Sequence, residues 1–103
     1  MSYDLVILTK GGEPDREVRV PLELHQRLLE LVQNVNFPLL SRLKDYYEDT
    51  EISRDEIPEF LTEVDQLLNL VGDDVILKRL LLDIRELAEA AIIQGKEMLG
   101  LAD

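Results

Sequence analysis

The chain has 103 residues, a net charge of −11 at pH 7 and no cysteine. Its length fits one domain, residues 1–103, that can bury a core without disulfides. The negative charge argues against nucleic acid and anionic membranes as partners, since both are polyanions. The lack of cysteine excludes thiolate catalysis and cysteine-ligated zinc, and it fits the cytoplasmic location that we expect. We predict neither a membrane span nor a signal peptide, because the apolar runs are short and the start is not basic.

The first 20 residues are predicted to form a β-hairpin, with strands at about 3–10 and 16–20. The run Leu5–Leu8 consists of β-forming residues that do not alternate with polar ones, so both faces of this strand need cover. A turn cluster, 11–15, separates it from a second run that alternates polar and apolar residues. Because a lone hairpin is marginal in water, it must lie on helices, pair with another chain, or both.

Apolar residues at helical spacing predict four helices, at about 21–34, 37–48, 54–71 and 74–99. The last carries the broadest apolar arc, so we expect the other elements to pack on it. The predicted fold class is therefore α+β, mostly α, with the last helix central. The predicted core comprises Leu5, Ile7, Val18, Val20, Leu28, Val32, Leu43, Phe60, Leu61, Val64, Leu68, Leu80, Ile84, Leu87, Ala91 and Ile92.

Capping residues support some of these helix ends. Ser53 and Glu56 have the spacing of a capping box, and Asp73 or Asp74 can cap the final helix, for which Gly100 is the expected end. Pro58 conflicts with a regular helix that starts beside Ser53. Either the first turn is 3₁₀-like, or the regular helix begins near Pro58.

Negative charge is concentrated between residues 45 and 65, where nine acids and one base give a net charge of −8. The helix dipole accounts for acids near residue 55, at a predicted helix start, but disfavours those at 45–49, at a predicted helix end. Acids at i, i+4 spacing also repel each other. A plain solvated face and a divalent-cation site stay open as alternatives, but we favour a surface for a basic protein partner. Its predicted contacts are Asp45, Tyr46, Tyr47, Glu48, Asp49, Glu51, Asp55, Glu59 and Glu63.

The two tyrosines fall at the edges of a predicted apolar stripe. Both rings can fill the core while their hydroxyls reach water, or they can anchor a protein partner beside the carboxylates. The segment Asp45-Tyr46-Tyr47 resembles the acidic tyrosine pair of the small helical immunity proteins of the nuclease colicins. The proline expected after that pair is missing, and the N-terminal hairpin departs from that fold. The resemblance implies capture of a basic protein.

His25 lies in the middle of the apolar face of the first helix. We expect a buried, hydrogen-bonded side chain, because catalysis would need a partner that the nearby sequence does not offer. No motif for a phosphate loop, a calcium loop or a Ser-His-Asp set occurs, so we predict no cofactor and no metal.

A second apolar line runs along the back of the last helix, through Val75, Leu82 and Ile93. The hairpin can cover this line, or it can form a homodimer contact, and an uncovered edge strand at Leu5–Leu8 would favour the dimer.

The preferred function is a small acidic, non-enzymatic interaction protein, immunity-protein-like or a regulatory adaptor. The alternatives are a homo-oligomeric assembly subunit and, ranked last, a small carboxylate- or metal-dependent enzyme.

Overall fold

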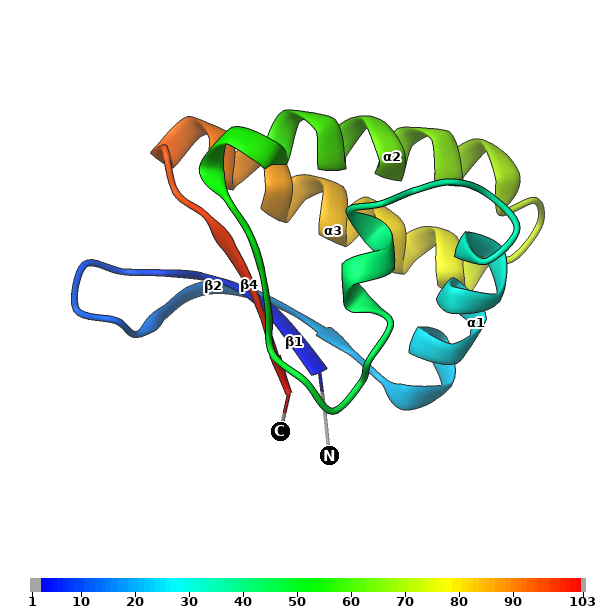
Figure 1. The fold of residues 1–103 in the computed structure, drawn as a ribbon, viewed down its shortest axis with the longest axis horizontal. Coiled ribbons are helices and arrows are strands. Elements are labelled where there is room, and N and C mark those ends of the chain that lie inside the picture. Colours follow the sequence, from blue (N-terminus) through cyan, green and yellow to red (C-terminus); the bar gives the residue numbers. More distant parts are fainter. Residues whose placement is uncertain (1–2, 103) are drawn as a thin grey trace.

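The computed structural model describes residues 3–102 (Figure 1). Within them lie four strands, three α-helices and two short 3₁₀ turns, so the α+β class is confirmed. The strands are β1 (Tyr3–Leu8), β2 (Pro14–Val20), β3 (Thr50–Ile52) and β4 (Met98–Ala102). The helices are α1 (Leu22–Val32), α2 (Ile57–Leu70) and α3 (Val75–Gln94), and the 3₁₀ turns are η1 (Leu40–Leu43) and η2 (Arg54–Glu56).

The strands form one antiparallel sheet in the order β2-β1-β4-β3, and the predicted hairpin is its β1–β2 pair. Leu5–Leu8 is not an uncovered edge, because β1 pairs with β2 on one side and with β4 on the other, so this argument for a dimer does not apply. Leu5 and Ile7 point into the core, and Val6 is buried on the opposite face between Glu17 and Leu99. Because successive side chains of β1 are buried on both faces, the run does not alternate with polar residues.

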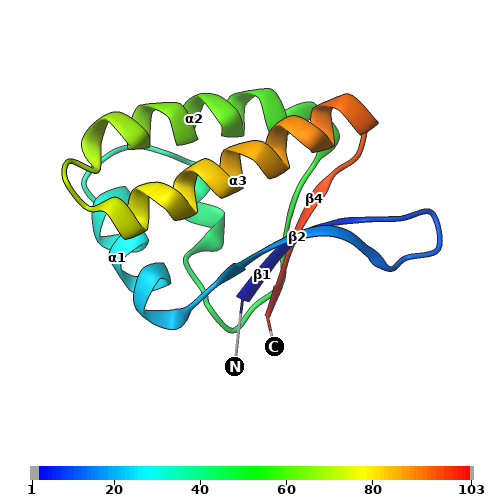
Figure 2. The same ribbon diagram turned by 180° about the vertical axis from the view of Figure 1, so that it is seen from behind.

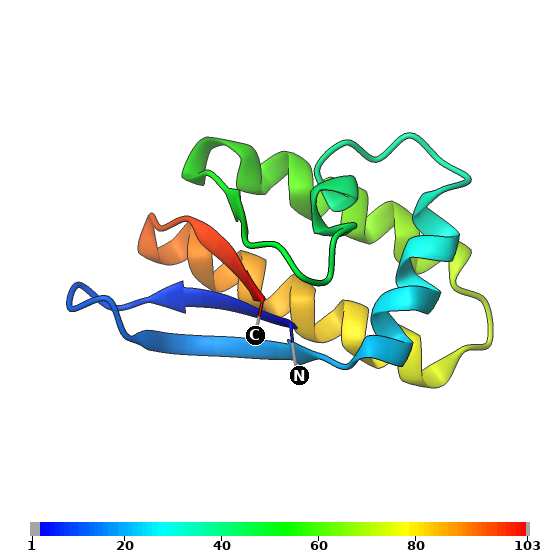
Figure 3. The ribbon, with the colours of Figure 1, turned by 60° about the horizontal axis from the view of Figure 1, so that its bottom comes forward.

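Helices cover one face of the sheet. α2 and α3 lie side by side on that face (Figures 1 and 2), and α3 also contacts α1, β1 and β2, as expected for the central helix. α1 closes the end of the molecule opposite the hairpin turn, which projects beyond the other elements (Figure 3). In residues 3–102 no helix packs on the other sheet face.

The predicted end of the last helix is wrong. α3 stops at Gln94, and Gly95 follows in the left-handed conformation with φ 65°, which is the usual way to end a helix with glycine. The chain then turns back and forms β4, so Gly100 lies inside a strand. The start of this helix agrees with prediction, since Asp74 caps α3 by accepting from the Leu77 N–H.

No helix forms at 37–48, where the prediction fails. Only η1, residues 40–43, is regular in this stretch, and the following loop leads into β3, a strand that the sequence did not indicate. Leu39, Leu40, Leu43 and Tyr46 are nevertheless buried, whereas Tyr47 is exposed.

Both alternatives for the start of the 54–71 helix hold: the first turn is a 3₁₀ turn, and the regular helix begins beside Pro58. Ser53 and Glu56 form the capping box, the turn η2 follows, and α2 begins at Ile57 with Pro58 in its first turn. The predicted core is mostly buried, while Val18, Leu61 and Leu68 pack partly buried against it. Ile92 is the exception: its side chain is 43% exposed.

Candidate protein-binding surface

The acidic stretch follows the outer edge of the sheet. The loop after η1 passes near the described chain ends, β3 then runs along the edge, and η2 leads into α2 (Figures 1 and 3). The stretch therefore gathers at one side of the molecule, although its members differ in what they do.

Glu63 is not on the surface. Its side chain is 5% exposed, and its carboxylate accepts hydrogen bonds from the backbone N–H groups of Leu39 (3.1 Å) and Leu40 (2.9 Å). Those N–H groups begin η1 and have no partner within that turn, so a carboxylate there replaces the missing acceptors. Glu63 thus holds the 37–43 segment on α2 and is unavailable to a partner, contrary to our expectation.

Two further acids of the predicted set are engaged by backbone. Asp45 Oδ1 accepts from the Tyr47 N–H at 2.8 Å, which closes a local turn, and Asp49 Oδ1 accepts from the Ala102 N–H at 2.7 Å. The second bond joins the loop to the end of β4.

Burial raises the pKa of the Tyr3 hydroxyl to about 12, and the nearby charges of Asp49 and Asp45 add to this effect.

The two tyrosines have separate roles. Tyr46 is buried, donates its hydroxyl to the Val20 carbonyl at 3.1 Å, and packs its ring 5.9 Å from that of Tyr3. Tyr47 is 62% exposed, and its ring lies edge-on to Tyr46 at 5.7 Å. Only Tyr47 is therefore positioned to touch a partner.

The expectation for His25 is confirmed. It is buried, its Nε2 lies 2.6 Å from the Leu43 carbonyl oxygen, and its ring packs 4.8 Å from that of Tyr46 and 5.6 Å from that of Tyr3. Within residues 3–102 no hydrogen bond or ion pair joins it to a carboxylate. This histidine links α1 to η1 within the core.

Some acids of the stretch are neutralised by arginine. Arg42 binds both carboxylate oxygens of Glu56, at 2.7 and 2.6 Å, and this bidentate bond with the Ser53 hydrogen bonds lowers the pKa of Glu56 to about 2. Arg85 pairs with Asp65 at 2.7 Å. Neither carboxylate belongs to the predicted contact set.

The remaining acids are exposed and have no ion pair with any cation of the described residues. Glu97, an exposed acid outside this stretch, was missed by the sequence analysis because residues 96–99 were expected in a helix. It comes directly before β4 and lies diagonally across from Glu51, since Glu51 pairs in register with Leu99. A hydrogen bond with Glu51 and the repulsion between the two groups raise the pKa of Glu97. We define the acidic edge as Tyr47, Glu48, Glu51, Asp55, Glu59 and Glu97.

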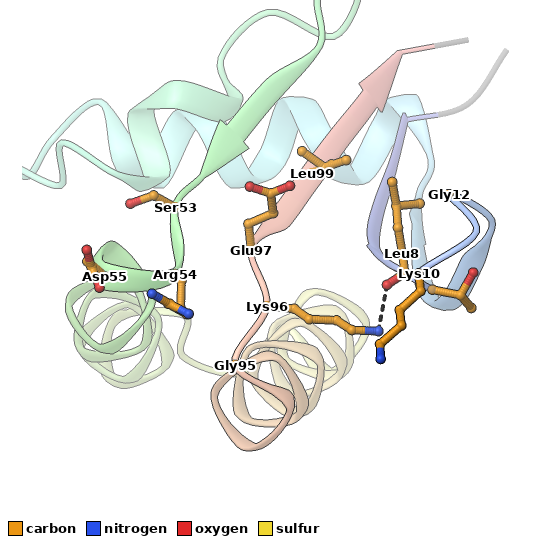
Figure 4. Close-up of a pocket in the computed structure, with 11 residues that line it drawn as sticks. Leu8, Lys10, Gly12, Ser53, Arg54, Asp55, Gly95, Lys96, Glu97 and Leu99 are labelled. Carbon is orange, nitrogen blue, oxygen red and sulfur yellow. Dashed lines mark hydrogen bonds between the residues drawn. The ribbon is translucent and has the colours of Figure 1, made fainter.

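A hollow of about 530 Å³ adjoins the acidic edge (Figure 4). It lies between the hairpin turn, the β3–η2 connection and the start of β4. Leu8 and Leu99 give it an apolar part, and the Lys96 ammonium donates to the Leu8 carbonyl at 2.7 Å. Arg54 and Asp55 border it on the η2 side. Its lining mixes both signs of charge, so it does not define one class of small ligand.

The predicted dimer residues all lie on the outward side of α3. Val75 is 76% exposed, Ile93 is 85% exposed, and Leu82 is partly exposed. The hairpin therefore does not cover this line, and the alternative in which it does is wrong.

Among residues 3–102 no three acidic or histidine side chains converge to hold a metal ion. None of the helices there combines the length and the apolar character that crossing a bilayer requires. Comparisons with protein-family models, with curated proteins and with solved structures found no match to this chain.

Proposed function

We propose that this protein is a non-enzymatic binding protein that captures a basic protein partner along the acidic edge. The observation that carries the proposal is the contact between Glu51 and Glu97. Glu97, directly before β4, lies diagonally across from Glu51 of β3, and no cation of the described residues pairs with either. Their hydrogen bond and their mutual repulsion raise the pKa of Glu97. A lysine or arginine from a partner would relieve that repulsion.

The proposed mechanism has two parts. The net charge of −11 and the unpaired acids attract a basic surface over a distance and speed its association. Tyr47 then supplies an exposed aromatic side chain that is held in place by its contact with Tyr46. Asp45 and Asp49 add negative charge beside it, although their main contacts are with backbone.

The test is capture of partners from a lysate of the native host, followed by kinetics with the partner found. In the variant Glu51→Lys/Glu97→Lys, we expect loss of capture, because two attractive positions become repulsive. In the unmodified protein, association should slow by roughly tenfold or more as ionic strength rises, since steering is screened by salt.

The matched control is Glu13→Lys/Glu30→Lys, which makes the same charge change at two exposed acids on the hairpin turn and on α1. This control should still capture the partner. Equal capture by the two double variants would contradict the proposal, because net charge alone would then be sufficient.

A further inference from the structure

The strand β2 leaves one side of the sheet open. It pairs only with β1, and in the described chain no hydrogen bond joins the outer backbone groups of residues 15–19 to another segment. The opposite edge is different, because Arg42 donates to the Glu51 carbonyl of β3. An open edge strand is a template for pairing with another strand.

The helix α3 lies above this open edge. Its contacts with the sheet are made mainly with β2 and less with β1 (Figure 2). Between β2 and α3 run two hollows of about 280 and 420 Å³ that share Arg16 and Glu86. On the outward side of α3, Glu86, Glu89 and Ile93 border these hollows. We call the hollows, with the edge of β2 and the outward side of α3, the groove.

The outward side of α3 has a heptad-like spacing of alternating four and three residues. This line comprises Val75, Arg79, Leu82, Glu86, Glu89 and Ile93. Such spacing places one seam of side chains along a helix, suited to packing against a second helix. Three pairs of positions on this line match about Ile84: Val75 with Ile93, which are both apolar, Arg79 with Glu89, which have opposite charges, and Leu82 with Glu86, which are unlike.

We propose that two copies of this chain associate through this groove about a two-fold axis. In that arrangement β2 pairs antiparallel with β2 of the second copy, and α3 packs antiparallel on its counterpart. Val75 then meets Ile93 of the second copy, and Arg79 meets its Glu89. One self-complementary contact then pairs the open edge of β2, covers the exposed apolar ends of α3 and joins its opposite charges.

The dimensions of the elements agree with this arrangement. Paired strands lie about 4.8 Å apart, and packed helices lie about 8–10 Å apart. The axis would lie about 2.4 Å from β2 and about 7 Å from β1. Because α3 contacts both strands, a position between these two distances is compatible with the helix spacing. Val18 and Glu86 line the same hollow, so the middle of β2 and the middle of α3 lie at the same level. With Val18 on the axis, Glu17 would face Arg19 of the second copy.

The ion pairs already present on α3 are compatible with the dimer. Arg79 pairs with Asp83 at 3.2 Å, and Glu89 pairs with Arg85 at 2.6 Å, all within one helix. These side chains are partly or largely exposed, so each pair contributes little to stability and can rearrange. In the dimer, Arg79 of one copy joins the Arg85–Glu89 pair of the other.

The test is sedimentation of the whole chain from low micromolar to submillimolar concentration. We expect a concentration-dependent dimer for the unmodified protein. The single variants Arg79→Glu and Glu89→Arg should each raise the dimer Kd by about 10- to 100-fold, because each turns two attractive contacts per dimer into two repulsive ones. An equimolar mixture of the two variants should recover association, since every contact across the axis then joins opposite charges.

The controls are Arg54→Glu and Glu30→Arg, exposed positions away from the groove, which should leave the dimer unchanged. Circular dichroism checks that each variant is folded. A protein that stays monomeric throughout, as expected if the groove instead takes an extended segment of another protein, overturns the proposal. Single variants that associate normally, or a mixture that does not recover association, overturn it as well.

Discussion

The ring of Tyr3 lies directly against Gly100, and a Cβ placed on residue 100 would overlap the Tyr3 hydroxyl. Gly100 belongs to β4, and it also lies close to the side chain of Thr50 on β3. The glycine is needed for space: a large aromatic side chain of β1 crosses the helix-facing side of β4 at this residue. Because of this close contact, a single methyl group added at Gly100 should lower the stability of the central strands.

The variant Gly100→Ala should lower the free energy of unfolding by about 1–3 kcal/mol, the usual cost of forcing extra volume into a packed core. Urea denaturation followed by circular dichroism measures this. The matched control is Gly11→Ala, where the nearest atom to an added Cβ is Thr9 Oγ1 at an ordinary 3.7 Å. Equal stability of the two variants would show that Tyr3 can move aside.

The buried hydroxyls of Tyr3 and Tyr46 should respond in opposite ways to removal. The Tyr3 hydroxyl is buried without a hydrogen-bond partner in the described chain, whereas the Tyr46 hydroxyl donates to the Val20 carbonyl. We expect Tyr3→Phe to leave the free energy of unfolding unchanged or to raise it, and Tyr46→Phe to lower it by about 0.5–1.5 kcal/mol. Thermal and urea denaturation compare the two. A greater loss in Tyr3→Phe than in Tyr46→Phe would contradict this account.

Glu63 should matter for stability and Glu59, one turn earlier, should not. Glu63→Gln replaces a buried charged acceptor of two backbone N–H groups by a neutral amide, so it should cost about 1–3 kcal/mol. Glu59→Gln changes an exposed side chain and should be close to neutral. Hydrogen exchange of the Leu39 and Leu40 amides gives a second readout, which should be faster in Glu63→Gln alone. Unchanged exchange there would remove Glu63 from its capping role.

The sequence predicted correctly those elements that are stabilised by contacts between residues close together in the chain. The hairpin, α1, the Ser53–Glu56 capping box and the Asp74 cap all rest on neighbouring residues. β4 was missed because Met98 and Leu99 continue the apolar arc of α3, and the stop signal at Gly95 was passed over. β3 has only three residues and exists because β4 pairs with it. A strand that depends on a distant strand leaves little trace in its own sequence.

The candidate site shows the same division. Between residues 37 and 48 the burial of Leu43 was predicted correctly, but the backbone forms only a 3₁₀ turn, which Glu63 of α2 anchors. The excess of negative charge was visible in the sequence, whereas the contacts of the individual carboxylates were not. Which carboxylates meet arginine, which bind backbone and which remain exposed depends on contacts between elements, as in the pairs Arg42–Glu56 and Glu51–Glu97.

The pair Glu51 and Glu97 should make stability depend on pH. The pKa of Glu97 is raised in the folded state, above its ordinary value of 4.5, by Glu51. A raised folded-state pKa contributes stability that is present below about pH 4.5 and is lost as pH rises through the folded-state pKa. Glu97→Gln should therefore match the unmodified protein at low pH and become the more stable of the two as pH approaches neutrality. Glu51→Gln should also raise the stability near neutral pH, because it removes the charge that repels Glu97.

Glu56→Gln serves as a control, because its effect on stability should change with pH in the opposite direction. Arg42 lowers the pKa of Glu56 to about 2, so its contribution is present above about pH 4.5 and is lost as pH falls toward 2. This variant should be less stable than the unmodified protein near neutral pH and should approach it in acid. Urea denaturation over a pH series measures both differences, and added salt should reduce the Glu97 effect at neutral pH. A Glu97→Gln variant whose advantage grows toward acid would contradict the assignment of repulsion to this pair.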